Sequence, residues 1–123
     1  MNKKDNIIIL KNDAVGDLVQ SLQAINNIIN RNKDKTITMY LSERSKDFTF
    51  LFNKQNIKFK VLNYNLSLID KINLLLDFLK INISSVYILT PKNYFFLLPL
   101  IFQKIKFYGL CLNGPNKYMR PNN

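Results

Sequence analysis

Apolar residues follow two alternating patterns along this chain. Short runs rich in β-branched and aromatic side chains are typical of strands, and apolar residues that recur every three or four positions are typical of helices. Because the first run is apolar at successive positions, we expect it to be covered on both faces within a parallel sheet. The predicted strands are Ile7–Leu10, Thr36–Leu41, Ile57–Leu62, Ser85–Leu89 and Ile105–Tyr108.

Four helices are predicted between these strands. The first carries one apolar stripe over residues 15–29, and the second is a short stripe over residues 48–52. The third begins at the capping pair Ser67 and Asp70, and the fourth, Tyr94–Gln103, is nearly all apolar. Its composition favours burial against the sheet.

Alternating strands and helices predict an α/β fold, a Rossmann-like three-layer sandwich with a parallel sheet over residues 1–109. Residues 110–123, rich in Gly, Pro and Asn, are expected to be a linker or truncated tail. The expected strand order is 3-2-1-4-5, and a flavodoxin-like order of the same elements is the alternative.

The expected order brings the first and fourth strands together at the point where ligands bind in open α/β sheets. Lys11–Asp17 should therefore lie close to Thr90–Asn93, with Ser42–Lys46 at the flank. The basic residues Arg44, Lys46 and Lys92 fall in these loops. They are candidates to bind a phosphate or carboxylate group of a substrate, and solvated surface charge is the alternative for each.

Asp13 has two interpretations. As the N-cap of the first helix, the commoner role at this position, its carboxylate would accept hydrogen bonds from nearby backbone N–H groups. Asp13→Asn should then leave stability almost unchanged, because Asn caps equally well. As a general base, the carboxylate would instead accept a proton from a bound hydroxyl. Asp17 suits the positive end of the helix dipole, and Gly16 is expected to permit close approach of neighbouring backbone or of a ligand.

Composition narrows the possible chemistry. The 123 residues are enough for one domain, and 47% of them are hydrophobic. The chain has no histidine and one cysteine, Cys111, so an internal disulfide and the usual zinc and nucleophile–histidine sites are excluded. A lone cysteine fits a reducing compartment. The glycine motifs of dinucleotide and P-loop sites do not occur, so no nucleotide cofactor is expected.

The formal net charge of +10 favours an anionic partner, either a nucleic acid, a lipid headgroup surface or a phosphorylated substrate. A composition biased toward Lys, Asn and Ile explains the same charge without any partner. No nucleic-acid-binding motif or aromatic stacking platform accompanies the charge, so no specific nucleic acid is expected.

The segment K-N-D-A-V-G-D-L-V-Q-S-L-Q-A-I-N-N-I, residues 11–28, resembles the amino-terminal signature of the heptosyltransferase-like glycosyltransferases, family 9. Asp13, Gly16 and Asp17 match that signature, and Lys11 stands at its basic position. The segments I-T-M-Y-L-S and K-I-K-F-Y-G are similar to the family's second strand and to a late strand that ends in glycine.

The resemblance implies the amino-terminal, acceptor-binding half of a GT-B glycosyltransferase. Such an enzyme transfers a sugar from a nucleotide-sugar donor to a glycan or lipopolysaccharide acceptor, with inversion and without a metal. Asp13 stands where the family places its catalytic base, and Lys11, Gly16 and Asp17 would belong to the acceptor site. The donor would bind a second domain, so this chain is expected to be a fragment. A cytoplasmic location, peripheral to the inner membrane, is implied.

The alternative is a non-enzymatic basic module that docks on an anionic membrane surface. A short apolar helix flanked by cations can lie at a membrane interface. The part of the chain with this pattern is Tyr94–Phe102, followed by Lys104 and Lys106.

Overall fold

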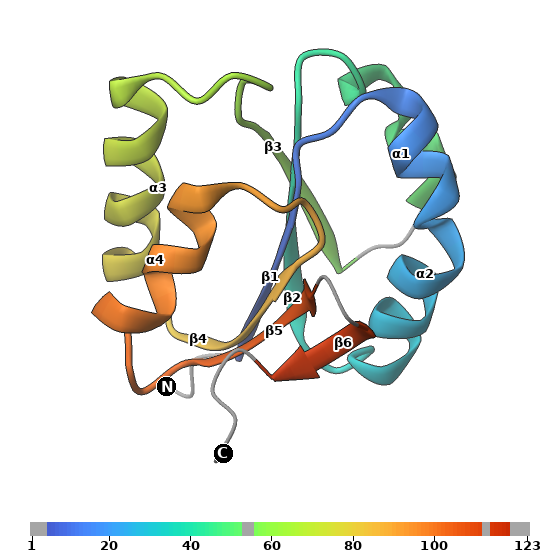
Figure 1. Ribbon diagram of the computed structural model, residues 1–123. Helices are drawn as coiled ribbons and strands as arrows, with labels where there is room; N and C mark the ends of the chain where they lie inside the picture. The colour runs from blue at the N-terminus through green and yellow to red at the C-terminus, as the bar shows by residue number, and fades with distance from the viewer. Residues whose placement is uncertain (1–4, 53–55, 112–113, 119–123) are drawn as a thin grey trace.

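The computed structural model describes residues 5–52, 56–111 and 114–118, which form a sheet with helices on both faces (Figure 1). The first part of the chain contains β1 (Asn6–Lys11), α1 (Val15–Gln20), α2 (Leu22–Arg31), β2 (Thr36–Leu41) and the 3-10 helix η1 (Lys46–Phe52). The second part contains β3 (Ile57–Val61), α3 (Leu68–Lys80), β4 (Ile83–Ile88), α4 (Asn93–Ile101), β5 (Lys106–Cys111) and β6 (Gly114–Tyr118).

The sheet has the order β3-β2-β1-β4-β5-β6. The first five strands are parallel, so the predicted Rossmann-like α/β fold with the order 3-2-1-4-5 is confirmed, and the flavodoxin-like order is wrong. In this order β1 lies between β2 and β4, with Ile7 opposite Ile37 on one side and Ser85 on the other. The carboxyl ends of β1 and β4 therefore meet at one edge of the sheet.

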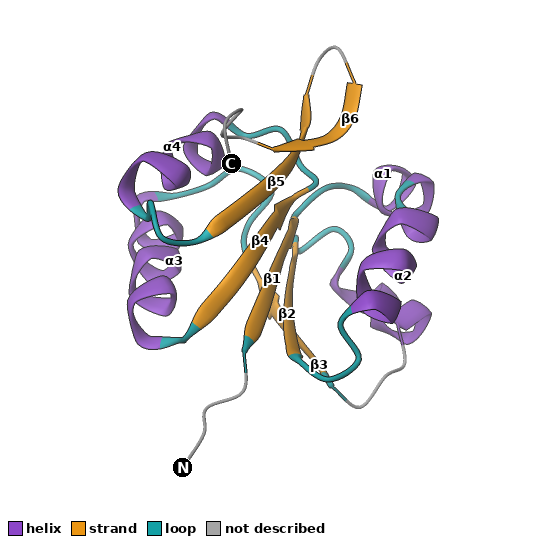
Figure 2. Ribbon diagram, turned by 90° about the horizontal axis from the view of Figure 1, so that it is seen from below, coloured by secondary structure: helices purple, strands orange, loops and turns teal. Residues whose placement is uncertain are grey.

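The core consists of two apolar layers separated by the sheet. Ile7 and Ile9 of β1 pack on the side of α1, α2 and η1, and Ile8 and Leu10 pack on the side of α3 and α4 (Figures 1 and 2). Successive residues of a strand point to opposite faces of the sheet, and helices cover both faces, so all four side chains are buried. The predicted covering of this strand on both faces is confirmed.

Two parts of the chain differ from the prediction. The first helix is interrupted at Ser21, whose φ of −93° and ψ of 3° depart from helical values, so α1 and α2 are separate helices. Residues 110–123, expected as linker or tail, contain β6, which pairs antiparallel with β5. The sequence of β6, G-P-N-K-Y, is not typical of a strand. A proline such as Pro115 is tolerated there because β6 lies at the edge of the sheet. Residues 112–113 and 119–123 lie outside the described residues.

Helix α3 begins as predicted. The backbone N–H of Asp70 donates to the hydroxyl of Ser67, and the Asp70 carboxylate accepts from the backbone N–H of Ser67, which completes a capping box. In its third turn, the Asp77 carboxylate accepts hydrogen bonds from Tyr40 at 2.7 Å and from Lys60 at 2.9 Å. Burial and the hydrogen bond to Asp77 raise the pKa of Tyr40. These contacts fix α3 over β2 and β3. Among the described residues, no helix has the length and apolar character needed to cross a membrane.

Candidate functional site

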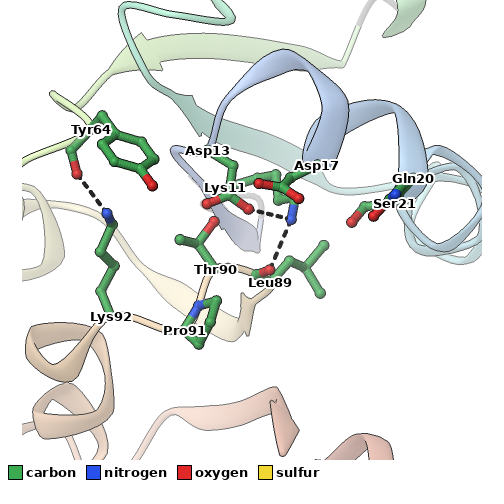
Figure 3. A pocket seen from close by; sticks show the side chains of 10 residues that line it. All are labelled: Lys11, Asp13, Asp17, Gln20, Ser21, Tyr64, Leu89, Thr90, Pro91 and Lys92. Carbon is green, nitrogen blue, oxygen red and sulfur yellow. Dashed lines mark hydrogen bonds and ion pairs between the residues drawn. The ribbon is translucent and has the colours of Figure 1, made fainter.

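The carboxyl ends of β1 and β4 form the floor of a pocket of about 400 Å³ (Figure 3). Its walls come from the loops after β1, β3 and β4 and from α1. The prediction that Lys11–Asp17 lies beside Thr90–Asn93 is confirmed, because residues of both segments line the pocket. The lining residues are Lys11, Asp13, Asp17, Gln20, Ser21, Tyr64, Leu89, Thr90, Pro91 and Lys92.

A buried ion pair lies at the carboxyl end of β1, and a hydrogen bond from its lysine links it to the end of β4. The Nζ of Lys11 donates to Oδ2 of Asp13 at 2.6 Å and to the carbonyl oxygen of Leu89 at 3.0 Å. The side chains of Lys11 and Asp13 are 4% and 11% exposed. A buried charge is tolerated where it is paired and hydrogen-bonded, so each member of this pair depends on the other.

The cap interpretation of Asp13 is wrong. Helix α1 begins at Val15 with Ala14 as its N-cap, and no side chain caps it. Asp13 therefore lies one residue outside the cap position, and its carboxylate pairs with the buried ammonium of Lys11. The general-base interpretation stays a prediction.

The rest of the signature has mixed outcomes. Asp17 lies in the first turn of α1, as expected, and its exposed side chain lines the pocket. A Cβ added at Gly16 would meet no atom within 4 Å, so the expectation that neighbouring backbone approaches Gly16 closely is wrong. The space beside Gly16 is open, and the expectation that a ligand approaches it stays a prediction.

The structure brings one of the three expected basic loop residues, Lys92, into the lining of the pocket, and it places a second, Arg44, against the ring of the lining residue Tyr64. Lys92 lines the pocket, donates from Nζ to the carbonyl oxygen of Tyr64 at 2.6 Å, and lies 4.0 Å from the centre of the Tyr64 ring. The guanidinium of Arg44 lies 4.1 Å from the same ring centre, a distance at which a cation is attracted to an aromatic face. Lys46 begins η1 and is not among the described residues that line the pocket.

Tyr64, which no sequence pattern marks, contacts three charged side chains. Besides Lys92 and Arg44, the carboxylate of Glu43 accepts the backbone N–H of Tyr64 at 2.7 Å. This hydrogen bond lowers the pKa of Glu43. The bond is therefore retained at neutral pH and is lost as the pH falls through the lowered pKa.

Ser42 connects the loops after β1 and β2. Its hydroxyl donates to the backbone oxygen of Asp13 at 2.6 Å and accepts the N–H of Arg44 at 3.1 Å. The buried serine thus fixes the backbone of Asp13 beneath the pocket. The expected flanking position of Ser42–Lys46 is confirmed at this residue, although no sequence pattern marks Ser42 itself.

Thr90 places an unused hydroxyl at the pocket. The residue is 2% exposed, and its Oγ1 has no hydrogen-bond partner among the residues that the structure describes. A buried polar atom without a partner costs about 1–3 kcal/mol, so this hydroxyl is a candidate group for binding a ligand. The sequence placed Thr90 near Asp13 through strand order alone.

Replacement of this hydroxyl by a methyl group tests whether it has a structural role. We expect Thr90→Val to leave the free energy of unfolding unchanged or to raise it by about 1 kcal/mol, because an unpaired buried hydroxyl is removed. Urea denaturation measures the change. A loss of stability of more than about 1 kcal/mol would show that the hydroxyl has a partner within the folded chain.

Comparisons with protein families, with curated proteins and with solved structures gave no significant match. Within the described residues, no three His, Cys, Asp or Glu side chains are grouped so that they could hold a metal ion. The pocket and the resemblance of residues 11–28 are therefore the features of the chain that indicate a function.

Proposed function

We propose that this chain is the acceptor-binding half of a GT-B glycosyltransferase that resembles family 9, with Asp13 as the general base. The observation that carries the proposal is the place of Asp13. Its carboxylate lies just beyond the carboxyl end of β1, at the switch point of the sheet, and lines a pocket that also holds the unpartnered hydroxyl of Thr90. Ligands of open α/β sheets bind at such points.

The groups around the pocket suit a substrate with several hydroxyls. Carboxylates, an amide and hydroxyls can exchange hydrogen bonds with a sugar, and an aromatic ring offers it an apolar face. These groups belong to Asp13, Asp17, Gln20, Ser21, Tyr64 and Thr90. Lys92 and Arg44, both beside Tyr64, would favour an acceptor that carries a carboxylate or phosphate.

In the proposed reaction, an acceptor hydroxyl attacks the anomeric carbon of a nucleotide-sugar donor. The new glycosidic bond forms as the bond to the nucleotide phosphate breaks, and the nucleotide leaves with that electron pair. Asp13 accepts the proton of the attacking hydroxyl. Because the attack is a single displacement on the face opposite the leaving nucleotide, the anomeric centre is inverted, and the family resemblance implies that no metal takes part. The donor would bind a second domain, which closes over the carboxyl edge of the sheet.

Calorimetric titration of this chain with glucuronic acid and with glucose tests the acceptor chemistry. We expect glucuronic acid to bind more tightly than glucose, because its carboxylate can pair with Lys92 or Arg44. Glutamine at both basic positions should remove the difference between the two sugars. If neither sugar binds, or if both bind equally to the unaltered chain, the proposed acceptor site is wrong.

A further inference from the structure

Helices α3 and α4 lie side by side over one face of the sheet (Figures 1 and 2). Near their first turns, the hydroxyl of Tyr94 donates to the carbonyl oxygen of Lys71 at 2.9 Å. Near their last turns, the rings of Phe78 and Phe102 are 5.2 Å apart between centres. The two helices thus form one continuous layer.

The outer side of this layer is apolar. On α3 the exposed apolar residues recur at three- and four-residue steps, which places them on one face, while Leu74 and Phe78 point into the core. Helix α4 adds three more exposed apolar side chains, although its nearly all-apolar composition predicted that the helix would be buried against the sheet. We name these eight side chains, which are 43–73% exposed, the α3–α4 surface: Leu68, Ile69, Ile72, Leu76, Leu79, Leu97, Leu100 and Ile101.

A grouping of this kind requires an explanation. Single exposed apolar side chains are common on folded proteins, but contiguous apolar patches mark sites that contact another protein or a membrane. The candidate pocket lies at the carboxyl edge of the sheet, and none of its lining residues belongs to this surface. The patch therefore has no role in the proposed acceptor site.

The charges beside the surface favour an anionic occupant. Lys80 ends α3, Lys104 and Lys106 follow α4, and all three are exposed. Lys80 also shares a groove with Lys58 and Lys60 of β3. The acidic groups of α3 are engaged elsewhere, Asp70 in the capping box and Asp77 with Tyr40 and Lys60.

The same charges disfavour a second copy of the chain. A symmetric dimer would bring the same patch of both copies together, and with it the same lysines. Each copy carries a formal net charge of +10, so the copies also repel each other at longer range. An apolar face bordered by lysines is the arrangement that binds the interface of an anionic bilayer.

We propose that the α3–α4 surface docks this protein peripherally on an anionic lipid membrane. The leucine and isoleucine side chains enter the boundary between headgroups and acyl chains, and Lys80, Lys104 and Lys106 contact lipid phosphates. The sequence suggested such docking through part of Tyr94–Phe102 with Lys104 and Lys106, whereas α3 supplies five of the eight exposed apolar side chains. This proposal goes beyond the proposed transferase function and does not depend on it.

Sedimentation with vesicles tests the proposal. The full chain should bind vesicles of equal parts phosphatidylglycerol and phosphatidylcholine, and should bind phosphatidylcholine alone at least about tenfold more weakly. High salt should weaken the binding to anionic vesicles, because exposed charges are screened.

Paired substitutions separate the two contributions. Leu79→Ser with Leu100→Ser should weaken binding at least about tenfold, because leucine side chains that leave water contribute most of the apolar attraction. The matched control, Val19→Ser with Phe50→Ser, removes exposed apolar side chains from the opposite helical layer and should leave binding unchanged. Lys104→Gln with Lys106→Gln should also weaken binding about tenfold or more, whereas Arg31→Gln with Lys33→Gln, the same loss of charge elsewhere, should have a smaller effect.

Three results would overturn the proposal. The first is a chain that does not bind anionic vesicles at low salt. The second is an equal loss of binding in the control variants, which would indicate general charge or hydrophobicity and no defined surface. The third is a chain that forms dimers, becomes monomeric with the two leucine substitutions and fails to bind vesicles, since a second copy would then occupy the surface. Circular dichroism melts verify that the surface variants remain folded.

Discussion

Asp13→Asn is expected to lower the free energy of unfolding by about 3–5 kcal/mol. The substitution leaves the ammonium of Lys11, whose side chain is 4% exposed, without its anionic partner at the end of β1. The carbonyl oxygen of Leu89 remains as a neutral acceptor, which does not offset the charge. This outcome is opposite to that of a helix cap, for which Asn and Asp are almost equivalent. Urea denaturation of the two proteins measures the difference.

A second variant identifies the cause of the loss. Lys11→Met with Asp13→Asn removes both charges and retains similar side-chain volumes, so it should recover most of the stability lost by Asp13→Asn alone. If Asp13→Asn is as stable as the unaltered chain, the pair contributes nothing and the buried-charge account is wrong. If the double variant is no more stable than the single one, the loss comes from packing or from polar contacts other than the ion pair.

The double variant also provides a test of catalysis that instability does not obscure. In an active assembly of this chain with a donor-binding domain, Lys11→Met with Asp13→Asn should lower turnover by about a hundred- to ten-thousand-fold, the usual contribution of a general base. Asp34→Asn, a change to an exposed carboxylate after α2, is the control and should retain normal turnover. Near-normal turnover of the double variant would reduce Asp13 to a structural partner of Lys11.

Most of the fold follows from local patterns. The strand Thr36–Leu41 is predicted at its observed bounds, because six successive β-branched, aromatic and aliphatic residues have few alternatives to a buried strand. Ser67 and Asp70 predict the start of α3 through a hydrogen-bond pattern that spans only three residues. The alternation of strands and helices then predicts a parallel sheet with β1 between β2 and β4. This order locates the pocket at the carboxyl ends of β1 and β4.

The features that the sequence did not predict depend on contacts between distant segments. The cap interpretation of Asp13 is wrong because the carboxylate pairs with Lys11, whose ammonium also donates to the carbonyl oxygen of Leu89, just after β4. Strand β6 exists through pairing with β5, and its own composition is typical of a loop. The exposed face of α3 was also not foreseen, because periodicity identifies an apolar stripe but not what covers it.

The candidate site was predicted in outline and not in its contacts. Strand order brought Asp13, Lys92 and Thr90 together, since it depends only on which strand ends are neighbours. The unpartnered hydroxyl of Thr90 and the three charged contacts of Tyr64 depend on side-chain positions in separate loops. No pattern within one segment carries that information.

The most direct test of the acceptor site is nuclear magnetic resonance of the isotope-labelled chain titrated with glucuronic acid. The account predicts saturable shifts of the backbone amides of Asp13, Asp17, Thr90 and Lys92, and about tenfold weaker binding in Thr90→Val, because the hydroxyl that bonds the ligand is lost. Another groove, lined by α2 with Tyr87 and Tyr108, offers a contrasting location. Shifts confined to that groove, or no saturable shifts at all, would contradict the assignment of the acceptor to the pocket beside Asp13.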